Sequence, residues 1–162
     1  MEGMIDLKDL EPIKIGVAFL RETGSMKAQL DLDAHLPTRA HKADAGLDLY
    51  AIKGGWVMPH SRKTFDTGVH IAIPEGYVGM LTSKSGMMAK QGITSRGTID
   101  SGYTGSIKAV LFNHSWKPVK IKSGQKITQL VLMAISTPKL EWVDSLEETE
   151  RSAGGFGSTG KF

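Results

Sequence analysis

A glycine-rich stretch near the C-terminus has the composition of a phosphate-binding segment. Residues 152–160 contain four Gly, with Phe156 among them and the hydroxyls of Ser158 and Thr159 close by, and Arg151 directly precedes the stretch. Glycine lets backbone N–H groups approach phosphate oxygens, Arg pairs with phosphate through two N–H groups, and Phe can stack on a base. The same composition is also typical of a disordered tail, and the residues alone leave both interpretations open.

Two further segments place polar side chains next to glycine. Ser83, Lys84 and Ser85 lie before Gly86 at the start of a short expected helix, where they can cradle a phosphate or simply cap a turn. Asp100 lies between turn glycines, after a strand-like pair. A carboxylate there is ionised at neutral pH and can orient a water molecule, although a turn-capping role is the commoner one.

Asp48 is a carboxylate in a strand-like context, because Leu47 and Leu49 flank it. Asp is disfavoured inside strands. We therefore expect a specific reason for it, such as a charged partner, an edge position or the water shell of a bound cation.

Short strands must position these groups. Residues 69–73 alternate between apolar and other residues with the two-residue period of a strand that has one buried face. Further strands are expected at 15–20, 77–81, 107–113, 119–121 and 126–135, and a short helix at 85–91. Many short strands between Gly and Pro turns predict an all-β sandwich or barrel. Residues 144–151 are charged and fit either a helix or a loose segment.

The expected organisation is a single domain with two extensions. Residues 1–14 are interpreted as an N-terminal extension, 15–144 as the β domain and 145–162 as a flexible C-terminal arm. Within the domain, residues 24–33 are expected to form a loop or an insertion.

Composition excludes several classes of function. The 20 Lys and Arg exceed the 17 Asp and Glu by three and form no run, which argues against a nucleic-acid partner. The longest apolar run, 130–135, is far shorter than the roughly 20 residues of a membrane helix. The chain has no Cys, so disulfides and thiolate chemistry are excluded, and its five His have no metal-type spacing. Without a signal-like N-terminus, a cytoplasmic location is expected.

Five segments, taken in order, resemble the motifs of the trimeric dUTPase family, which hydrolyses dUTP to dUMP and pyrophosphate. They are residues 45–51, 83–92, 97–113, 124–130 and 151–160, and the resemblance covers about residues 36–162. It implies an all-β, jelly-roll-like subunit in a homotrimer, with the C-terminal arm of one subunit completing the active site of another. It also implies Mg²⁺ bound to the substrate phosphates.

The resemblance implies a role for each matching residue. Asp100 is the catalytic base that holds the attacking water, and Tyr103 lies under the deoxyribose with Ile99 beside it. Backbone groups that pair with uracil are implied at Thr94, Gly97 and Thr98. Phosphate contacts are implied at Lys84, Ser85, Gly86 and Gln129. The arm is implied to close over the nucleotide through Arg151, Phe156, Gly157, Ser158 and Thr159. Asp48 is implied in the outer shell of Mg²⁺, through water.

The chain departs from the family pattern at a few positions. Lys84 and Thr104 stand where Arg is usual or frequent, and Gln125 and Lys126 replace a common Asp-Arg pair. The last change leaves open whether an ion pair of the family is kept.

Two functions other than dUTP hydrolysis are alternatives. A dCTP deaminase-like enzyme, related by fold, would need a Glu on the strand after the Asp100 turn, and residues 107–113 contain no carboxylate. A nucleotide-responsive regulatory protein with a protein partner is the other, and no residue pattern favours it.

Overall fold

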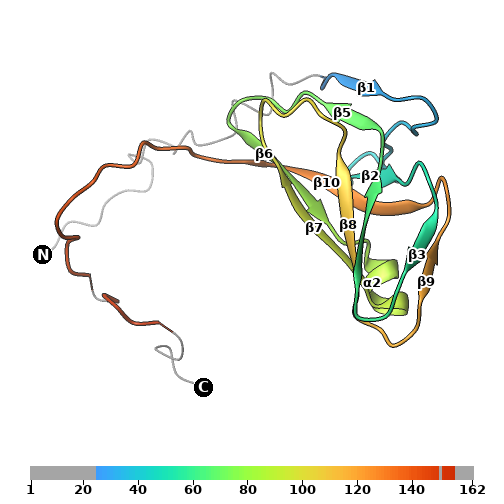
Figure 1. Cartoon of the computed structure of the whole chain (residues 1–162). Helices are drawn as coiled ribbons and strands as arrows, with labels where there is room; N and C mark the ends of the chain where they lie inside the picture. Colours follow the sequence, from blue (N-terminus) through green and yellow to red (C-terminus); the bar gives the residue numbers. More distant parts are fainter. Residues whose placement is uncertain (1–24, 150, 156–162) are drawn as a thin grey trace, which may run out of the picture.

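The computed structural model describes residues 25–149 and 151–155, and these form a mostly β domain with one short helix (Figure 1). In chain order the elements are β1 (Ala28–Leu30), β2 (Gly46–Tyr50), β3 (Gly55–Val57), β4 (Arg62–Asp66), β5 (Val69–Ile71), β6 (Tyr77–Thr82), α2 (Ser85–Gln91), β7 (Ile93–Ile99), β8 (Lys108–Asn113), β9 (Val119–Ile121) and β10 (Lys126–Ala134). The all-β prediction is confirmed.

All strand pairs among the described residues are antiparallel. A six-stranded sheet has the order β2-β10-β6-β7-β8-β4, and two further sheets each pair two strands, β1 with β5 and β3 with β9. Figure 1 shows the β1–β5 ribbon at one end of the domain and the β3–β9 ribbon with α2 at the other. The site residues on β2, β10, β6 and β7 therefore lie in adjacent strands of one sheet.

Two apolar clusters form the core. One surrounds α2 and includes Met87, Leu111 and Ile121, while the other includes Leu81 and Leu130. The alternation read from the sequence has its physical origin here: β8 buries every second residue, Ala109, Leu111 and Asn113. Each fully buried Leu or Ile side chain contributes about 1.5–3 kcal/mol relative to an exposed one.

The predicted helix is present with the expected bounds. Met87 anchors it to the core, and Gly92 ends it in a left-handed conformation with φ of 65°. The Gly92 N–H donates to the carbonyl of Met88, at 3.1 Å. Glycine adopts this conformation without the steric cost that a Cβ brings, so the chain turns directly into β7.

Three expectations concern the periphery of the domain. Residues 24–33 are not simply a loop or an insertion, because residues 28–30 form β1 and pair with β5. A three-residue edge strand with an exposed face leaves too little hydrophobic pattern to be recognised. The strand expected at 15–20 lies outside the described residues. Residues 144–149 contain no helix.

Beyond β10 the chain runs away from the domain in an extended path (Figure 1). Along it Leu140, Trp142 and Leu146 are 98%, 88% and 85% exposed. No helix among the described residues combines the length and apolar character needed to cross a membrane.

Candidate active site

Three predicted site residues, Asp48, Lys84 and Gln129, lie close together where β2, β10 and β6 are side by side. Gln129 on the central strand β10 is in register with Asp48 on β2 and with Thr82 on β6. The chain leaves β6 at Thr82, so Lys84 follows two residues later and can reach back across the sheet. The side-chain amide of Gln129 donates to the carbonyl of Ser83, at 3.4 Å, which joins this segment to β10.

Asp48 is the centre of an ion-pair cluster. Its side chain is only 9% exposed, and Lys84 Nζ contacts Oδ1 while Lys126 Nζ lies 2.8 Å from Oδ2. Burial raises the pKa of the Asp48 carboxyl, but the hydrogen bonds and charges of Lys126 and Lys84 outweigh it, so the pKa lies below its ordinary value. The two lysines are the charged partners that a carboxylate inside a strand requires.

The lysine at position 126 therefore keeps an ion pair, which the sequence had left open. Lys84 also binds a carboxylate within the domain, so its charge is already partly compensated. Ser85 and Gly86, the first residues of α2, are exposed next to it.

Strands β7 and β8 form a fork. They pair with each other only from Ile93 to Ser95, opposite residues 111–113. Beyond that point β7 pairs with β6 through residues 96–99, and β8 pairs with β4 through residues 108–110. The two strands diverge away from α2 in Figure 1. Gly97, Thr98 and Ile99 thus line one arm of the fork, and Thr94 lies at its base, where its hydroxyl is 2.7 Å from His114 Nε2.

The loop that closes the fork carries Asp100 and Tyr103. The Tyr103 N–H donates to the carbonyl of Asp100 at 3.2 Å, and Gly102 has φ of 84°, so the chain makes a tight turn. The Asp100 side chain is exposed, and no other described residue makes a hydrogen bond or ion pair with its carboxylate. The carboxylate is therefore available to a water molecule or ligand.

The Tyr103 ring is fixed over the end of the same loop. Its hydroxyl donates to the carbonyl of Ser106, at 3.1 Å, and the residue is 45% exposed. A Cβ at Gly105 would lie 2.5 Å from that hydroxyl oxygen, so the close approach needs glycine.

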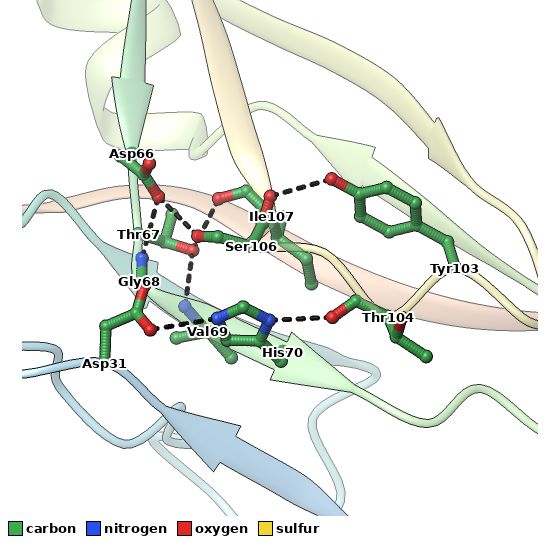
Figure 2. A network of polar contacts seen from close by, with 10 residues as sticks. All are labelled: Asp31, Asp66, Thr67, Gly68, Val69, His70, Tyr103, Thr104, Ser106 and Ile107. Atoms are coloured by element: carbon green, nitrogen blue, oxygen red, sulfur yellow. Dashed lines mark hydrogen bonds and ion pairs between the residues drawn. The ribbon is translucent and has the colours of Figure 1, made fainter.

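A polar network holds the loop to the rest of the domain (Figure 2). The Ser106 hydroxyl donates to Asp66 Oδ1, which also accepts the Gly68 N–H at 3.0 Å. His70 on β5 contacts the Thr104 carbonyl through Nδ1, at 2.7 Å, and Asp31 Oδ1 through Nε2, at 3.1 Å.

Sequence reasoning missed this network. The five His have no metal-type spacing, and none of the five motif segments includes Asp31, Asp66 or His70. The contacts of His70 join residues 34 and 39 positions apart in the chain, so no local motif signals them.

The predicted site residues lie in two groups on neighbouring parts of one sheet. Asp48, Lys84 and Gln129 belong to the sheet cluster, with Ser85 and Gly86 adjacent. The second group is the fork and its loop, with Thr94, Gly97, Thr98, Ile99, Asp100 and Tyr103. No described hydrogen bond or ion pair joins Asp100 to the sheet cluster. In the arm, Arg151 Nε donates to the Gly154 carbonyl at 3.1 Å, whereas Phe156, Gly157, Ser158 and Thr159 lie outside the described residues.

The donor set near Asp48 limits how a metal ion can bind. The described residues contain no group of three or more His, Asp or Glu side chains suited to a metal ion. A carboxylate offers about four acceptor sites, and lysines take two of those on Asp48. The remaining sites fit a water molecule of a Mg²⁺ shell but not a protein cage of direct ligands.

Comparison with known proteins gives a consistent result. The family model described as dUTPase matches residues 33–160. The deoxyuridine 5'-triphosphate nucleotidohydrolase of Corynebacterium glutamicum is 41% identical over 137 residues, covering 82% of this chain and 92% of the relative. That of Kluyveromyces lactis is 41% identical over 142 residues, covering 86% and 96%.

Solved structures agree with these relatives. The dUTPase of Staphylococcus bacteriophage 80alpha with dUPNHPP superposes with a TM-score of 0.79 at 32% identity, covering 85% of this chain and 99% of the phage chain. The D-to-N mutant dUTPase of phage phi11, solved with a structural Mg(II) ion, gives a TM-score of 0.71 at 30% identity and covers 76% and 99%. The family model and both relatives span most of this chain, and it belongs to the dUTPase family.

Proposed function

We propose that this protein hydrolyses dUTP to dUMP and pyrophosphate, with Asp100 as the catalytic base. The observation that carries the proposal is the position of Asp100, an exposed and unengaged carboxylate on the loop that closes the β7–β8 fork. Asp100 takes a proton from a water molecule whose oxygen bonds to the α-phosphorus. The bond from that phosphorus to the α,β-bridging oxygen breaks, and pyrophosphate leaves.

The fork is the proposed binding site for the uracil base of the nucleotide. Where β7 and β8 part, backbone groups near Thr94, Gly97 and Thr98 are available for the edge of a uracil ring. Ile99 and the fixed Tyr103 ring lie next, where they support the sugar. Because the Tyr103 hydroxyl is held by Ser106, the ring cannot easily move aside for a 2′-hydroxyl, and this favours deoxyribose.

The sheet cluster and the arm are the proposed phosphate site. Ser85 and Gly86 donate to phosphate oxygens, Gln129 adds a hydrogen bond, and Lys84 brings positive charge. The arm is proposed to contribute through Arg151, Phe156, Gly157, Ser158 and Thr159, with Phe156 stacked on the base. Lys84 keeps a charge but lacks the two-pronged grip of Arg, so a weaker hold on phosphate is expected.

A homotrimer with shared active sites is part of the proposal. Groups from another subunit are proposed to complete each site, because no described hydrogen bond or ion pair joins Asp100 to the sheet cluster. The exposed Leu140, Trp142 and Leu146 also need apolar cover that their own domain does not give them.

Mg²⁺ is the proposed cofactor, and when bound it neutralises and orients the triphosphate. Asp48 would hold one of its waters through a free acceptor site, and Lys84 and Lys126 keep Asp48 ionised for this role. The cytoplasmic location predicted from the sequence stays a prediction.

A pyrophosphate-release assay on dUTP, dTTP, dCTP and UTP, with Mg²⁺ and with a chelator, tests the proposal. We expect release from dUTP to be far faster than from the other three and to fall with the chelator. Ammonia release from dCTP would instead indicate the deaminase. That alternative lacks support from β8, where Lys108–Asn113 contains no carboxylate.

A regulatory role is the second alternative. The phage 80alpha neighbours include dUTPases described as controlling the transfer of virulence genes. No residue of this chain positively favours such a role, and the exposed Asp100 carboxylate favours catalysis.

A further inference from the structure

His70 joins the active-site loop to a distant part of the chain. Nδ1 lies 2.7 Å from the carbonyl oxygen of Thr104, the residue after Tyr103, and Nε2 lies 3.1 Å from Asp31 Oδ1. Figure 2 shows the imidazole ring between these two partners, with one nitrogen directed at each.

Both partners accept hydrogen bonds and neither can donate one. A backbone carbonyl has only lone pairs to offer, and so has an ionised carboxylate. A neutral imidazole carries one N–H and can satisfy only one of them, whereas the imidazolium carries two. The two contacts seen together are therefore those of a protonated His70.

The charged groups around His70 favour this form. Asp31 faces it from the segment after β1, and Asp66 lies nearby at the end of β4. A small cavity of about 220 Å³ is lined by both His70 and Lys27, the residue before β1, so Lys27 is a positive charge on the same side of the domain. The hydrogen bond to the Thr104 carbonyl is the largest cause that raises the pKa of His70 above its ordinary value, and Asp31 adds to it, against the opposing effect of desolvation.

The loop held by His70 is the one that carries the proposed catalytic groups. Asp100 opens it and Tyr103 follows, and its far end is fixed by the bond from Ser106 to Asp66. The His70 contact to Thr104 lies between these points. Losing it would free the middle of the loop while both ends stay attached.

We propose that His70 is a positioning residue for dUTP hydrolysis, whose imidazolium ties Thr104 to Asp31 and so keeps Asp100 and Tyr103 in their working positions. This inference rests on the proposed function. Deprotonation of His70 leaves one N–H for two acceptors, so the loop loosens as pH rises. Small misplacement of catalytic groups lowers turnover strongly.

The test is the pH profile of kcat for dUTP in four proteins: wild type, His70→Gln, Asp31→Asn and His41→Gln. In the wild type we expect kcat to fall as pH rises, along a limb set by the deprotonation of His70. His70→Gln should lose that limb and lower kcat at neutral pH by about threefold to tenfold, with a smaller change in KM.

Asp31→Asn should move the limb to lower pH, because the carboxylate that favours the imidazolium is gone. His41→Gln changes an exposed His whose side chain has no contact in the network, and it should keep the wild-type profile. An NMR titration of the His70 ring nitrogens provides a readout that does not depend on turnover.

The proposal is overturned if His70→Gln keeps the wild-type pH profile, or if the NMR titration shows His70 losing its proton at or below its ordinary pKa of about 6.5. Failure of the proposed function looks different, since the wild type would then release no pyrophosphate from dUTP at any pH. The NMR titration of wild type and Asp31→Asn would still decide whether a protonated His70 joins Thr104 to Asp31.

Discussion

The Nζ atom of Lys126 lies 2.8 Å from Oδ2 of Asp48, on the neighbouring strand of the sheet. Lys84 contacts the other carboxylate oxygen, so one buried carboxylate holds two lysines, one at the start of β10 and one directly before α2. The cluster connects β2, β10 and the start of α2. It therefore fixes the segment that carries Ser85 and Gly86.

Asp48→Asn should destabilise the domain by about 2 kcal/mol. The amide keeps the shape of the side chain but removes the charge, leaving two lysines without their common partner. Urea unfolding at neutral pH and fixed protein concentration measures the change. Glu75→Gln, in an exposed turn, is the matched control and should shift the free energy of unfolding by less than about 0.5 kcal/mol. Equal midpoints for Asp48→Asn and wild type would contradict the assigned role.

The same ion pairs should make stability depend on pH in acid. The folded-state pKa of Asp48 is lowered, so its contribution is fully present above the unfolded-state pKa of about 3.9 and is lost as pH falls through the folded-state value. The stability difference between wild type and Asp48→Asn should therefore shrink below about pH 4. Urea midpoints from pH 7 to 3 test this. Asp66, whose pKa is also lowered, is present in both proteins and cancels in the difference.

Asp100→Asn should lower kcat for dUTP by about 10²–10⁴-fold while a non-cleavable dUTP analogue still binds. The amide keeps the size of the side chain but cannot accept the proton of the attacking water. Pyrophosphate release measures turnover, and calorimetry measures binding. A variant that keeps wild-type kcat would remove Asp100 from the mechanism.

Gly105→Ala should weaken discrimination between dUTP and UTP. The new Cβ would lie 2.5 Å from the Tyr103 hydroxyl oxygen, so the ring must move and lose its bond to Ser106. We expect the ratio of kcat/KM for the two substrates to fall by about tenfold or more. Tyr103→Phe keeps the ring and should lose less. If the alanine variant discriminates as well as wild type, the ring does not select the sugar.

Deleting the residues after Arg151 should remove most activity and leave the fold intact. The sheets and both apolar clusters are built from residues 26–134, so the deleted part adds nothing to the described core. Circular dichroism and thermal unfolding check the fold, and pyrophosphate release checks activity. Unfolding of the truncated chain would show that the arm is a structural element instead of a lid.

Periodicity predicted the parts of the fold that bury one face of a strand. The bounds of α2 and β9 agree with the expectation, because Gly92 ends the helix and Pro118 precedes the strand. The β1 strand was not recognised, since an exposed three-residue edge strand has no apolar period to detect. The order of the strands in the sheets did not follow from local patterns either.

The site was predictable to the extent that family motifs mark it. Asp100, Tyr103 and Asp48 stand in motif positions, and their roles in the site stay predictions. His70, Asp31 and Ser106 could not be found this way, because their contacts depend on tertiary packing of segments far apart in the chain.

The divergence of β7 and β8 has a consequence for ligand selection. Each strand is hydrogen-bonded along its outer edge to a neighbour, β7 to β6 and β8 to β4. Neither strand can therefore move toward the other without breaking these hydrogen bonds. The opening between β7 and β8 is therefore already formed before a ligand binds. A nucleotide bound there, as proposed, would spend little free energy on ordering the two strands, and we expect this preformed opening to favour a uracil ring over one with an additional methyl group.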